Sequence, residues 1–291
     1  MHRAVVLWGC WVAVLVAVVV TALRVMLEQR GRRRQHVQRA DEWRRRRRQA
    51  VETPDRPKDG CSADAQAAHE TFSSSTRPVH VVVVLGSGGH TTEMLALLRG
   101  DHGLWGLPAD APPVDVSFVY AATDRRTPTW RQRFAEALPP SWRVLGWHAI
   151  PRAREVGQNW LSTVFTSVAA LLASWRLLLW WWWRSQTPWL GRQRPPACSF
   201  PAVIICNGPG TCIPLCAAAW MMRVLRRIGN GGGALCPTTD RPRLVFVETV
   251  ARVQHLSVSG RCLYGCADRV IVQWAPLARR YPLCEFYGRL V

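Results

Sequence analysis

An apolar run that leads directly into a glycine-rich turn constrains the fold of this chain more than any other feature. Residues 79–85 (VHVVVVL) have the β-branched composition of a buried strand, and the segment GSGGH follows at once. A helix-forming stretch begins near Thr91, so the unpaired amides of its first turn and its positive end point back at the turn. The sequence therefore predicts a cradle for phosphate or pyrophosphate, with the ionisable His90 at its edge.

The spacing of these glycines differs from that of two common nucleotide-binding loops. No Gly-Lys-Ser/Thr follows, so the turn is not a Walker loop, and the spacing departs from G-x-G-x-x-G. No acidic residue ends a second strand about 20 residues further on, where a dinucleotide ribose would require one. A nucleotide-dependent oxidoreductase would therefore explain the turn but not the missing ribose-binding acid.

A second turn of the same kind follows a second apolar run. Residues 202–206 read as a buried strand, residues 207–211 (NGPGT) as a turn, and residues 211–227 as a helix. The carboxyl ends of parallel strands share one edge of a sheet, so we expect the two turns to lie side by side. Together they offer enough amides to hold both phosphates of a pyrophosphate, although Asn207 by itself is also an ordinary turn residue.

Short apolar runs alternate with helical stretches from residue 79 onward. We predict strands over residues 79–85, 114–120, 144–150, 202–206, 244–247, 269–273 and 285–287. We predict helices over residues 91–98, 130–138, 162–183, 211–227 and 276–280. This alternation predicts an α/β protein with a single Rossmann-like parallel sheet and helices on both of its faces.

Polar side chains also follow two other predicted strands. Glu248 comes after residues 244–247, where it could orient a sugar hydroxyl, act as a base or cap the next helix. Arg152 and Arg154 come after the third predicted strand, where they could meet phosphate or pair with Glu155 on the surface. These roles stay open until the fold is known.

The first 23 residues read as a membrane anchor. Residues 4–23 carry no charge and are apolar or small, and about 20 such residues span a bilayer core. A cleaved signal peptide is the alternative, but arginines follow the run in place of a small-residue cleavage site. Residues 24–58 hold 13 basic and 5 acidic side chains, so the positive-inside rule places the bulk of the protein in the cytosol. We therefore expect three parts, namely a short lumenal tail with a single transmembrane anchor (residues 1–23), an arginine-rich linker of low order (24–77) and a cytosolic domain (78–291).

Neither the charge nor the cysteines point to a nucleic acid or a metal. The formal net charge is +19, from 38 basic and 19 acidic side chains, but residues 24–58 account for +8 of it. Anionic lipid headgroups are the simpler partner for that tract. The ten cysteines contain no C-x-x-C pair, and no histidine completes a zinc pattern beside Cys212/Cys216 or Cys262/Cys266. We expect reduced thiols, membrane lipids as a partner, and no nucleic acid, metal or cofactor.

Residues 161–183 form a long apolar stretch that ends in four tryptophans, at positions 180–183, and is interrupted by Arg176. A second membrane span would place Arg176 within the bilayer and would move everything after it to the other side. The alternatives are a helix in the membrane interface, with tryptophan at headgroup level, and an ordinary core helix.

Blocks of sequence occur in the order LGSGGHTTEML, IPRAREVGQNWLSTVFT, ICNGPGTCIP, VFVETVARVQHLSVSGRCLY and ADRVIVQWAPLARRYP, followed by FYGRLV. In this order they resemble the asparagine-linked glycosylation fourteen family over about residues 79–291. The resemblance implies the membrane-anchoring, acceptor-binding subunit of a transferase that adds the second N-acetylglucosamine (GlcNAc) to dolichol-pyrophosphate-GlcNAc. It also implies a β1,4 linkage made with inversion, on the cytosolic face of the endoplasmic reticulum.

The same resemblance implies a fold like the amino-terminal half of a GT-B glycosyltransferase and a separate cytosolic catalytic subunit that binds UDP-GlcNAc. The length of the chain agrees with this division. A two-domain sugar-nucleotide transferase needs two such sheets, and roughly 210 residues supply one. We therefore expect a heterodimer in which the partner completes the active site, and little activity from this chain alone.

The resemblance assigns roles by position. The acceptor pyrophosphate would contact the two turns and an arginine, and the carboxyl-terminal residues would contact the catalytic subunit. The acceptor-binding candidates are Gly86, Ser87, Gly88, Gly89, Asn207, Gly208, Pro209, Gly210, Thr211 and Arg152, and the partner-binding candidates are Tyr287, Gly288, Arg289, Leu290 and Val291. His90 and Glu248 are the candidates for the general base, and we expect the helix amino terminus to keep His90 neutral. The alternative function is a purely structural recruiter of the catalytic subunit, without acceptor chemistry of its own.

Overall fold

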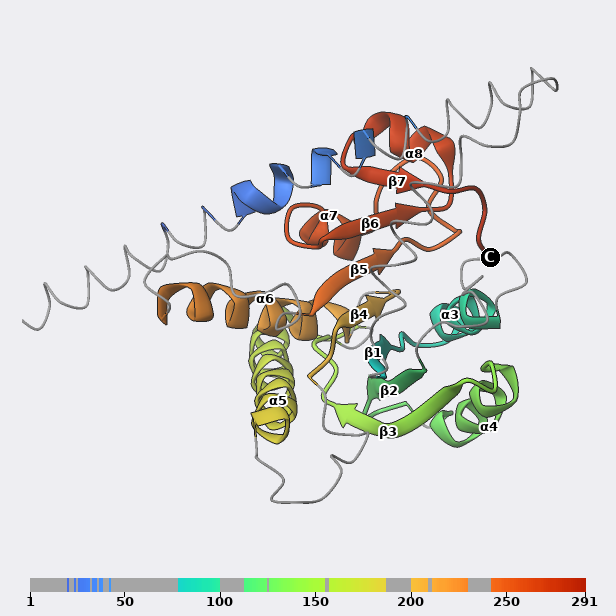
Figure 1. Ribbon diagram of the computed structural model, residues 1–291, viewed down its shortest axis with the longest axis vertical. Helices are drawn as coiled ribbons and strands as arrows, with labels where there is room; N and C mark the ends of the chain where they lie inside the picture. The colour runs from blue at the N-terminus through green and yellow to red at the C-terminus, as the bar shows by residue number, and fades with distance from the viewer. Residues whose placement is uncertain are drawn as a thin grey trace, which may run out of the picture.

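Seven parallel strands form one twisted sheet at the centre of the computed structural model (Figure 1). The structure describes residues 78–99, 113–124, 126–154, 157–186, 200–208, 211–229 and 242–291, with scattered positions between residues 20 and 42. The predicted anchor, apart from Val20, lies outside the described residues, and so do Pro209 and Gly210 of the second turn.

The strands are β1 (Val79–Val84), β2 (Val114–Ala121), β3 (Trp142–Ile150), β4 (Val203–Cys206), β5 (Arg243–Val247), β6 (Arg269–Val272) and β7 (Cys284–Phe286). Their order across the sheet is β3-β2-β1-β4-β5-β6-β7, and every neighbouring pair is parallel. The chain therefore moves outward from β1 to β3 and returns to β4 beside β1, which creates a topological switch point between β1 and β4. The predicted Rossmann-like parallel sheet is confirmed.

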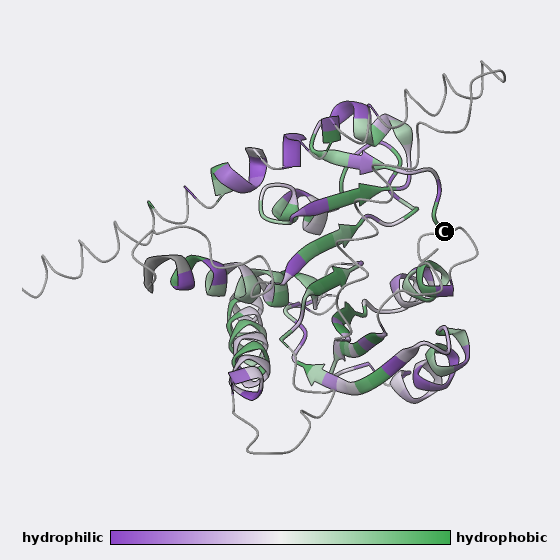
Figure 2. Ribbon diagram, in the orientation of Figure 1, coloured by the Kyte–Doolittle hydropathy of each residue, from purple (hydrophilic) through white to green (hydrophobic). Residues whose placement is uncertain are grey.

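Helices cover both faces of this sheet, as predicted. On one face lie α3 (Gly89–Arg99) and α4 (Thr127–Ala137), and on the other lie α5 (Trp160–Gln186), α6 (Cys212–Gly229), α7 (Val258–Leu263) and α8 (Ala275–Arg280) (Figure 1). Side chains alternate along β1, so that Val82 and Val84 pack under α5 and α6 while Val81 and Val83 pack under α3. Figure 2 shows apolar residues along the strands, as burial on both faces of a sheet requires.

Among the described elements from residue 78 onward, the short helix α7 is the one that the sequence did not predict. It has only six residues, and Gly260 in its middle lowers its helix propensity. A capping residue compensates, because Gly260 N donates to the hydroxyl of Ser257, 3.0 Å away, at the start of the helix. The predicted helix after the first glycine turn is confirmed, and it begins at Gly89, two residues before Thr91.

Part of the arginine-rich linker differs from the prediction of low order. Its described residues between positions 26 and 38 are helical. Arg33 is buried among the carboxyl-terminal elements, where its guanidinium donates to the carbonyl oxygens of Tyr264 and Ala267. This segment therefore packs beside the connection between α7 and β6, at the end of the sheet opposite to α4.

Candidate functional site

The two glycine turns meet at the switch point, with His90 between them. Gly208 has a φ of +99°, and a Cβ atom there would lie 2.9 Å from Cγ of His90. A Cβ atom at Gly86 would lie 2.6 Å from Cβ of His90 and 3.0 Å from the carbonyl oxygen of Asn207. Real Cβ atoms do not make contacts this short, so the packing of both turns around the imidazole requires glycine at both positions. The predicted side-by-side arrangement is confirmed.

Threonine hydroxyls fix the ends of the two turns. Thr91 Oγ1 donates to the carbonyl oxygen of Gly86 over 2.7 Å, and Thr211 Oγ1 donates to that of Leu85 over 2.8 Å. Both threonines are buried. The second bond joins the start of α6 to the end of β1, so the amino ends of α3 and α6 are held at one edge of the sheet.

The mouth of the first turn faces solvent. Ser87, Gly88 and Gly89 are all exposed, and Gly88 has a φ of +60°, a conformation that glycine adopts without strain. An anion could therefore approach these residues and the first amides of α3 from outside. In the second turn, Gly208 is buried under His90, and the two residues that follow lie outside the described part of the chain.

A polar network at this edge fixes the tautomer of His90. Asn207 Nδ2 donates to Glu93 Oε2 over 2.8 Å, since a carboxylate only accepts. Asn207 Oδ1 therefore faces His90 Nδ1, 3.1 Å away, and this pairing requires the proton on Nδ1. Because Nδ1 carries the proton, the lone pair of the neutral imidazole is on Nε2. Thr249 Oγ1, at the end of β5, completes the network by donating to Glu93 Oε1 over 2.6 Å.

The charge of Glu93 dominates the titration of this network. Hydrogen bonding to Glu93 is the main cause that raises the pKa of His90 above its ordinary value, against the lowering effect of burial. Burial acts to raise the pKa of Glu93, but hydrogen bonds from His90, Thr249 and Asn207 outweigh it, so this pKa lies below its ordinary value.

The expectation that the helix amino terminus keeps His90 neutral is wrong in direction. Glu93 Oε2 lies 3.5 Å from His90 Nδ1 and carries a full negative charge, whereas a helix end is equivalent to about half a positive charge. The carboxylate therefore outweighs the helix. An imidazole with a raised pKa, held in one tautomer by a carboxylate and an amide, is suited to accept a proton at its other nitrogen.

Glu248 is buried and holds Ser257, the N-cap residue of α7, so it supports that cap and is not the cap itself. Its Oε1 accepts from Thr249 N over 3.0 Å, and its Oε2 accepts from the backbone N and the hydroxyl of Ser257 over 2.9 and 3.0 Å. Burial raises the pKa of Glu248 above its ordinary value. Glu248 is 1% exposed, and its bonds join the end of β5 to the start of α7, so it fixes the loop between them.

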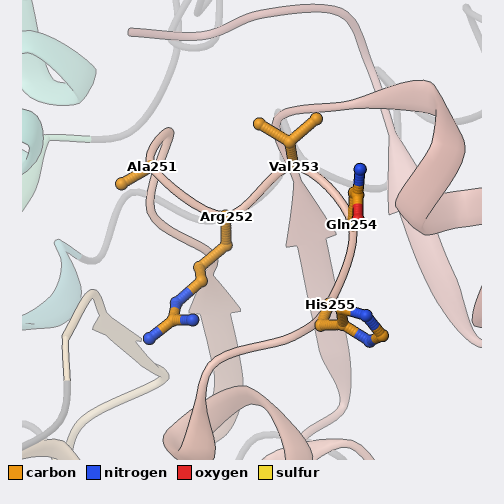
Figure 3. Close-up of a pocket in the computed structure, with 5 residues that line it drawn as sticks. All are labelled: Ala251, Arg252, Val253, Gln254 and His255. Atoms are coloured by element: carbon orange, nitrogen blue, oxygen red, sulfur yellow. The ribbon is translucent and has the colours of Figure 1, made fainter.

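Two arginines border the sheet edge at different distances from the turns. Arg152 follows β3, three strand positions from β4, which corresponds to about 14 Å at the usual strand spacing. Arg252 is exposed on the loop after β5, which is the neighbour of β4. Residues 251–255 of this loop line a depression of about 260 Å³, and Figure 3 shows the Arg252 and His255 side chains extending from the loop in different directions.

The predicted partner-binding residues divide into exposed and buried positions. Tyr287 and Arg289 are exposed, and Gly288 between them has a φ of +96°. Leu290 is buried in the core on the α3 side, where its backbone N donates to Gln273 Oε1 over 2.8 Å. The last residue packs beside it. The exposed side chains of this tail are therefore those of Tyr287 and Arg289, and Leu290 anchors the tail in the core.

Sequence reasoning missed Glu93, Thr249 and Arg252. Glu93 lies three residues after His90 in a helix, and residues at that spacing share a face, so the pair was open to prediction. Thr249 and Arg252 come from the far side of the switch point and approach the turns only through the order of the strands.

A parallel α/β sheet with two facing glycine turns at its switch point defines a Rossmann-like domain, the class in which the carboxyl edge of the strands is the usual place for a ligand. The family comparison agrees with the resemblance noted in the sequence. The chain belongs to the family described as "Oligosaccharide biosynthesis protein Alg14 like", whose model matches residues 81–290.

Named relatives match this chain over about three quarters of its length. The "UDP-N-acetylglucosamine transferase subunit ALG14" of Homo sapiens is 32% identical over 216 residues, which are 72% of this chain and 82% of the relative. The protein of the same name in Yarrowia lipolytica is 33% identical over 228 residues, 77% of this chain and 88% of the relative. In Schizosaccharomyces pombe the figures are 33% over 219 residues, 74% and 86%. Among solved structures, a UDP-glucosyltransferase from Polygonum tinctorium covers 75% of this chain and 53% of its own, at 13% identity and a TM-score of 0.37, which is too distant to carry an argument.

Proposed function

We propose that this chain is the membrane-anchored, acceptor-binding subunit of a UDP-GlcNAc transferase of the endoplasmic reticulum. It binds dolichol-pyrophosphate-GlcNAc on the cytosolic face, and a separate catalytic subunit brings UDP-GlcNAc, so that the second GlcNAc is added in a β1,4 linkage. The similar proteins of Homo sapiens and Yarrowia lipolytica are named as subunits of a UDP-N-acetylglucosamine transferase, which supports this choice of enzyme. The observation that carries the acceptor role is the pair of glycine turns packed around His90 at the switch point.

The acceptor pyrophosphate is assigned to the exposed mouth of the first turn. Ser87, Gly88 and Gly89 offer an open backbone, and the amino ends of α3 and α6 add positive partial charge from two sides. Arg252 is the cation best placed to approach a second phosphate, since its loop follows the strand next to β4. Arg152 is assigned a weaker contribution because it follows the edge strand β3.

His90 is assigned the general base at Nε2. The hydroxyl oxygen of the acceptor sugar attacks the anomeric carbon of the donor, and its proton passes to Nε2. The bond from the anomeric carbon to the UDP oxygen breaks, and the leaving UDP takes that electron pair. One displacement inverts the anomeric carbon, so an α-linked donor gives a β-linked product. Glu93 and Asn207 keep the Nδ1 proton in place, which leaves Nε2 as the accepting atom.

The donor half of the site is assigned to the partner. The structure describes one parallel sheet, whereas a two-domain sugar-nucleotide transferase closes two such sheets on its substrates. The exposed Tyr287 and Arg289 are the proposed contact with the catalytic subunit. This division predicts that substitutions at the turns leave donor binding intact.

The test is GlcNAc transfer to a lipid-pyrophosphate acceptor by the purified complex of both subunits. His90→Ala is expected to lower kcat by about 10²–10⁴-fold, the usual contribution of a general base. Gln132→Ala, at an exposed position of α4, is the control and is expected to stay within twofold, about 0.4 kcal/mol. A loss of under threefold for His90→Ala, with the partner still bound, would favour a purely structural recruiter. Full activity without any partner would refute the split active site.

A further inference from the structure

One side of α5 exposes a stripe of large apolar side chains, and the exposed Arg176 lies within it. Phe165 is 77% exposed, Leu172 58% and Trp183 61%. Other exposed members of the stripe are Val164, Val168, Leu179, Trp180 and Trp182. Figure 2 shows apolar residues along the length of the helix. An exposed apolar surface of this size, interrupted only at Arg176, marks an interaction site.

The opposite side of α5 is fixed to the domain. Ala170, Ser174, Leu178 and Trp181 are buried, at the helical spacing that places them on one face. Leu178 and Trp181 belong to the core shared with α6 and the sheet. The helix is therefore largely apolar on both of its faces, one buried in the domain and the other exposed.

The connections of α5 exclude a membrane span. By length and composition, the segment Ser162–Gln186 is the one candidate for a span within the described part of the chain. It links β3 to β4, and both strands belong to one sheet in which β1 pairs with β4. The two ends of α5 must therefore lie on the same side of any membrane. Of the three alternatives that the sequence left open, the core helix is also excluded, because eight large side chains face outward.

The charges around the stripe favour a lipid surface over a protein partner. The 27 residues of α5 and the 18 of α6 contain no Asp or Glu. Arginines flank the tryptophans, with the Arg184 guanidinium 5.0 Å from the Trp180 ring centre and that of Arg226 5.9 Å from the Trp182 ring centre. Tryptophan beside arginine is the composition that settles at the boundary of acyl chains and anionic headgroups.

We propose that α5 lies flat in the cytosolic membrane interface and attaches the domain to the membrane a second time, in addition to the predicted anchor. The occupant of the exposed stripe is the bilayer surface itself. Lying in the plane, 27 residues give a contact about 40 Å long at 1.5 Å per residue. Two separated attachments restrict the rotation of the domain, so the sheet keeps one orientation to the membrane.

Photocrosslinking of the full-length complex in vesicles tests this proposal. The photoreactive residue p-benzoylphenylalanine replaces Leu172 or Trp183 on the stripe, and in the control it replaces Gln132, an exposed residue of α4 on the other face of the sheet. The vesicles contain phosphatidylcholine with phosphatidylinositol as the anionic lipid, and the phospholipids are radiolabelled. An interfacial helix is expected to give at least about tenfold more labelled lipid adduct from Leu172 and Trp183 than from Gln132.

Two results would overturn the proposal. One is lipid labelling at Leu172 and Trp183 no greater than at Gln132. The other is a crosslink from Leu172 to the catalytic subunit or to a second copy of the chain in place of lipid, which would make the stripe a protein interface. Because the replaced side chains are exposed, the substitutions leave the core intact. The assay uses no sugar acceptor, so its outcome is independent of the proposed enzymatic function.

Discussion

Replacing Glu93 with glutamine tests whether the charge of Glu93 positions the His90 proton, without a change in the shape of the site. The change removes the negative charge and keeps the size of the side chain. In the native network, Glu93 accepts from Asn207 and Thr249 and lies 3.5 Å from His90 Nδ1. A neutral amide at this position can also donate, so the Asn207 side chain is free to reverse and to offer its Nδ2 group to Nδ1. The reversed pair favours the tautomer with its proton on Nε2, which cannot act as a base there.

The size of the effect follows from the hydrogen bonds involved. A hydrogen bond to a charged group contributes about 1.5–3 kcal/mol and one between neutral groups about 0.5–1.5 kcal/mol. The difference, about 1–1.5 kcal/mol, corresponds to roughly tenfold in tautomer preference. We therefore expect Glu93→Gln to lower kcat by about tenfold, less than His90→Ala. Glu136→Gln is the matched control, since Glu136 is an exposed residue of α4 that accepts only a local bond from Gln132.

The pH profile of kcat/KM gives the sharper test. Activity that needs neutral His90 rises as the pH rises through its pKa in the free complex. Glu93 is the main cause that raises this pKa, so its neutral replacement lowers the pKa and moves the acid limb to lower pH. Steady-state assays of the purified complex on the lipid acceptor, over the acid and neutral range, measure the shift. An acid limb that stays in place or moves to higher pH in Glu93→Gln would refute the pairing of these residues.

Three further changes give separate expectations. Gly208→Ala strains a φ of +99° and drives a methyl group into the His90 ring, so we expect a loss of about 1–3 kcal/mol in unfolding free energy, read as a lower Tm; an unchanged Tm would contradict the packing. Arg252→Ala is expected to raise the KM for the lipid acceptor about three- to tenfold, because it removes one phosphate contact that solvent screens. Arg152→Ala is expected to raise this KM less. A larger rise for Arg152→Ala than for Arg252→Ala would indicate that the diphosphate binds nearer to β3. Arg289→Ala is expected to weaken partner affinity about fivefold with an unchanged Tm, because its side chain is exposed; a pull-down titration that matches wild type would remove this contact.

The sheet could be predicted because its strands consist mainly of consecutive β-branched and apolar residues. The central strands β1 and β2 are almost wholly buried, whereas the edge strand β3 is partly exposed; in every case the strand bounds agree with the predicted ones to within two residues. The meeting of the two turns also followed from sequence, since parallel strands bring their carboxyl ends to one edge. The short helix α7 was missed because its stability comes from Ser257 and from Glu248, which holds that serine, rather than from its own composition.

The chemistry of the site needed the tertiary structure. The direction of the His90 pKa depends on a carboxylate one helical turn away, and a helix-dipole argument alone gave the wrong sign. The sequence left three roles open for Glu248, and its three hydrogen bonds to Thr249 and Ser257 become visible only in the fold. The exposed side of α5 was hidden for a similar reason, because an apolar sequence does not reveal which of its side chains the fold leaves uncovered.

The anchoring of Leu290 has a consequence for assembly. With this side chain in the core and its amide bonded to Gln273, the tail that carries Tyr287 and Arg289 is tethered at both of its ends. A protein that docks there meets a surface already in its final shape. Immobilising a side chain on binding costs about 0.5–1.5 kcal/mol, and a preorganised tail avoids much of that entropic loss. Association at this point should therefore behave as rigid-body docking rather than as folding coupled to binding.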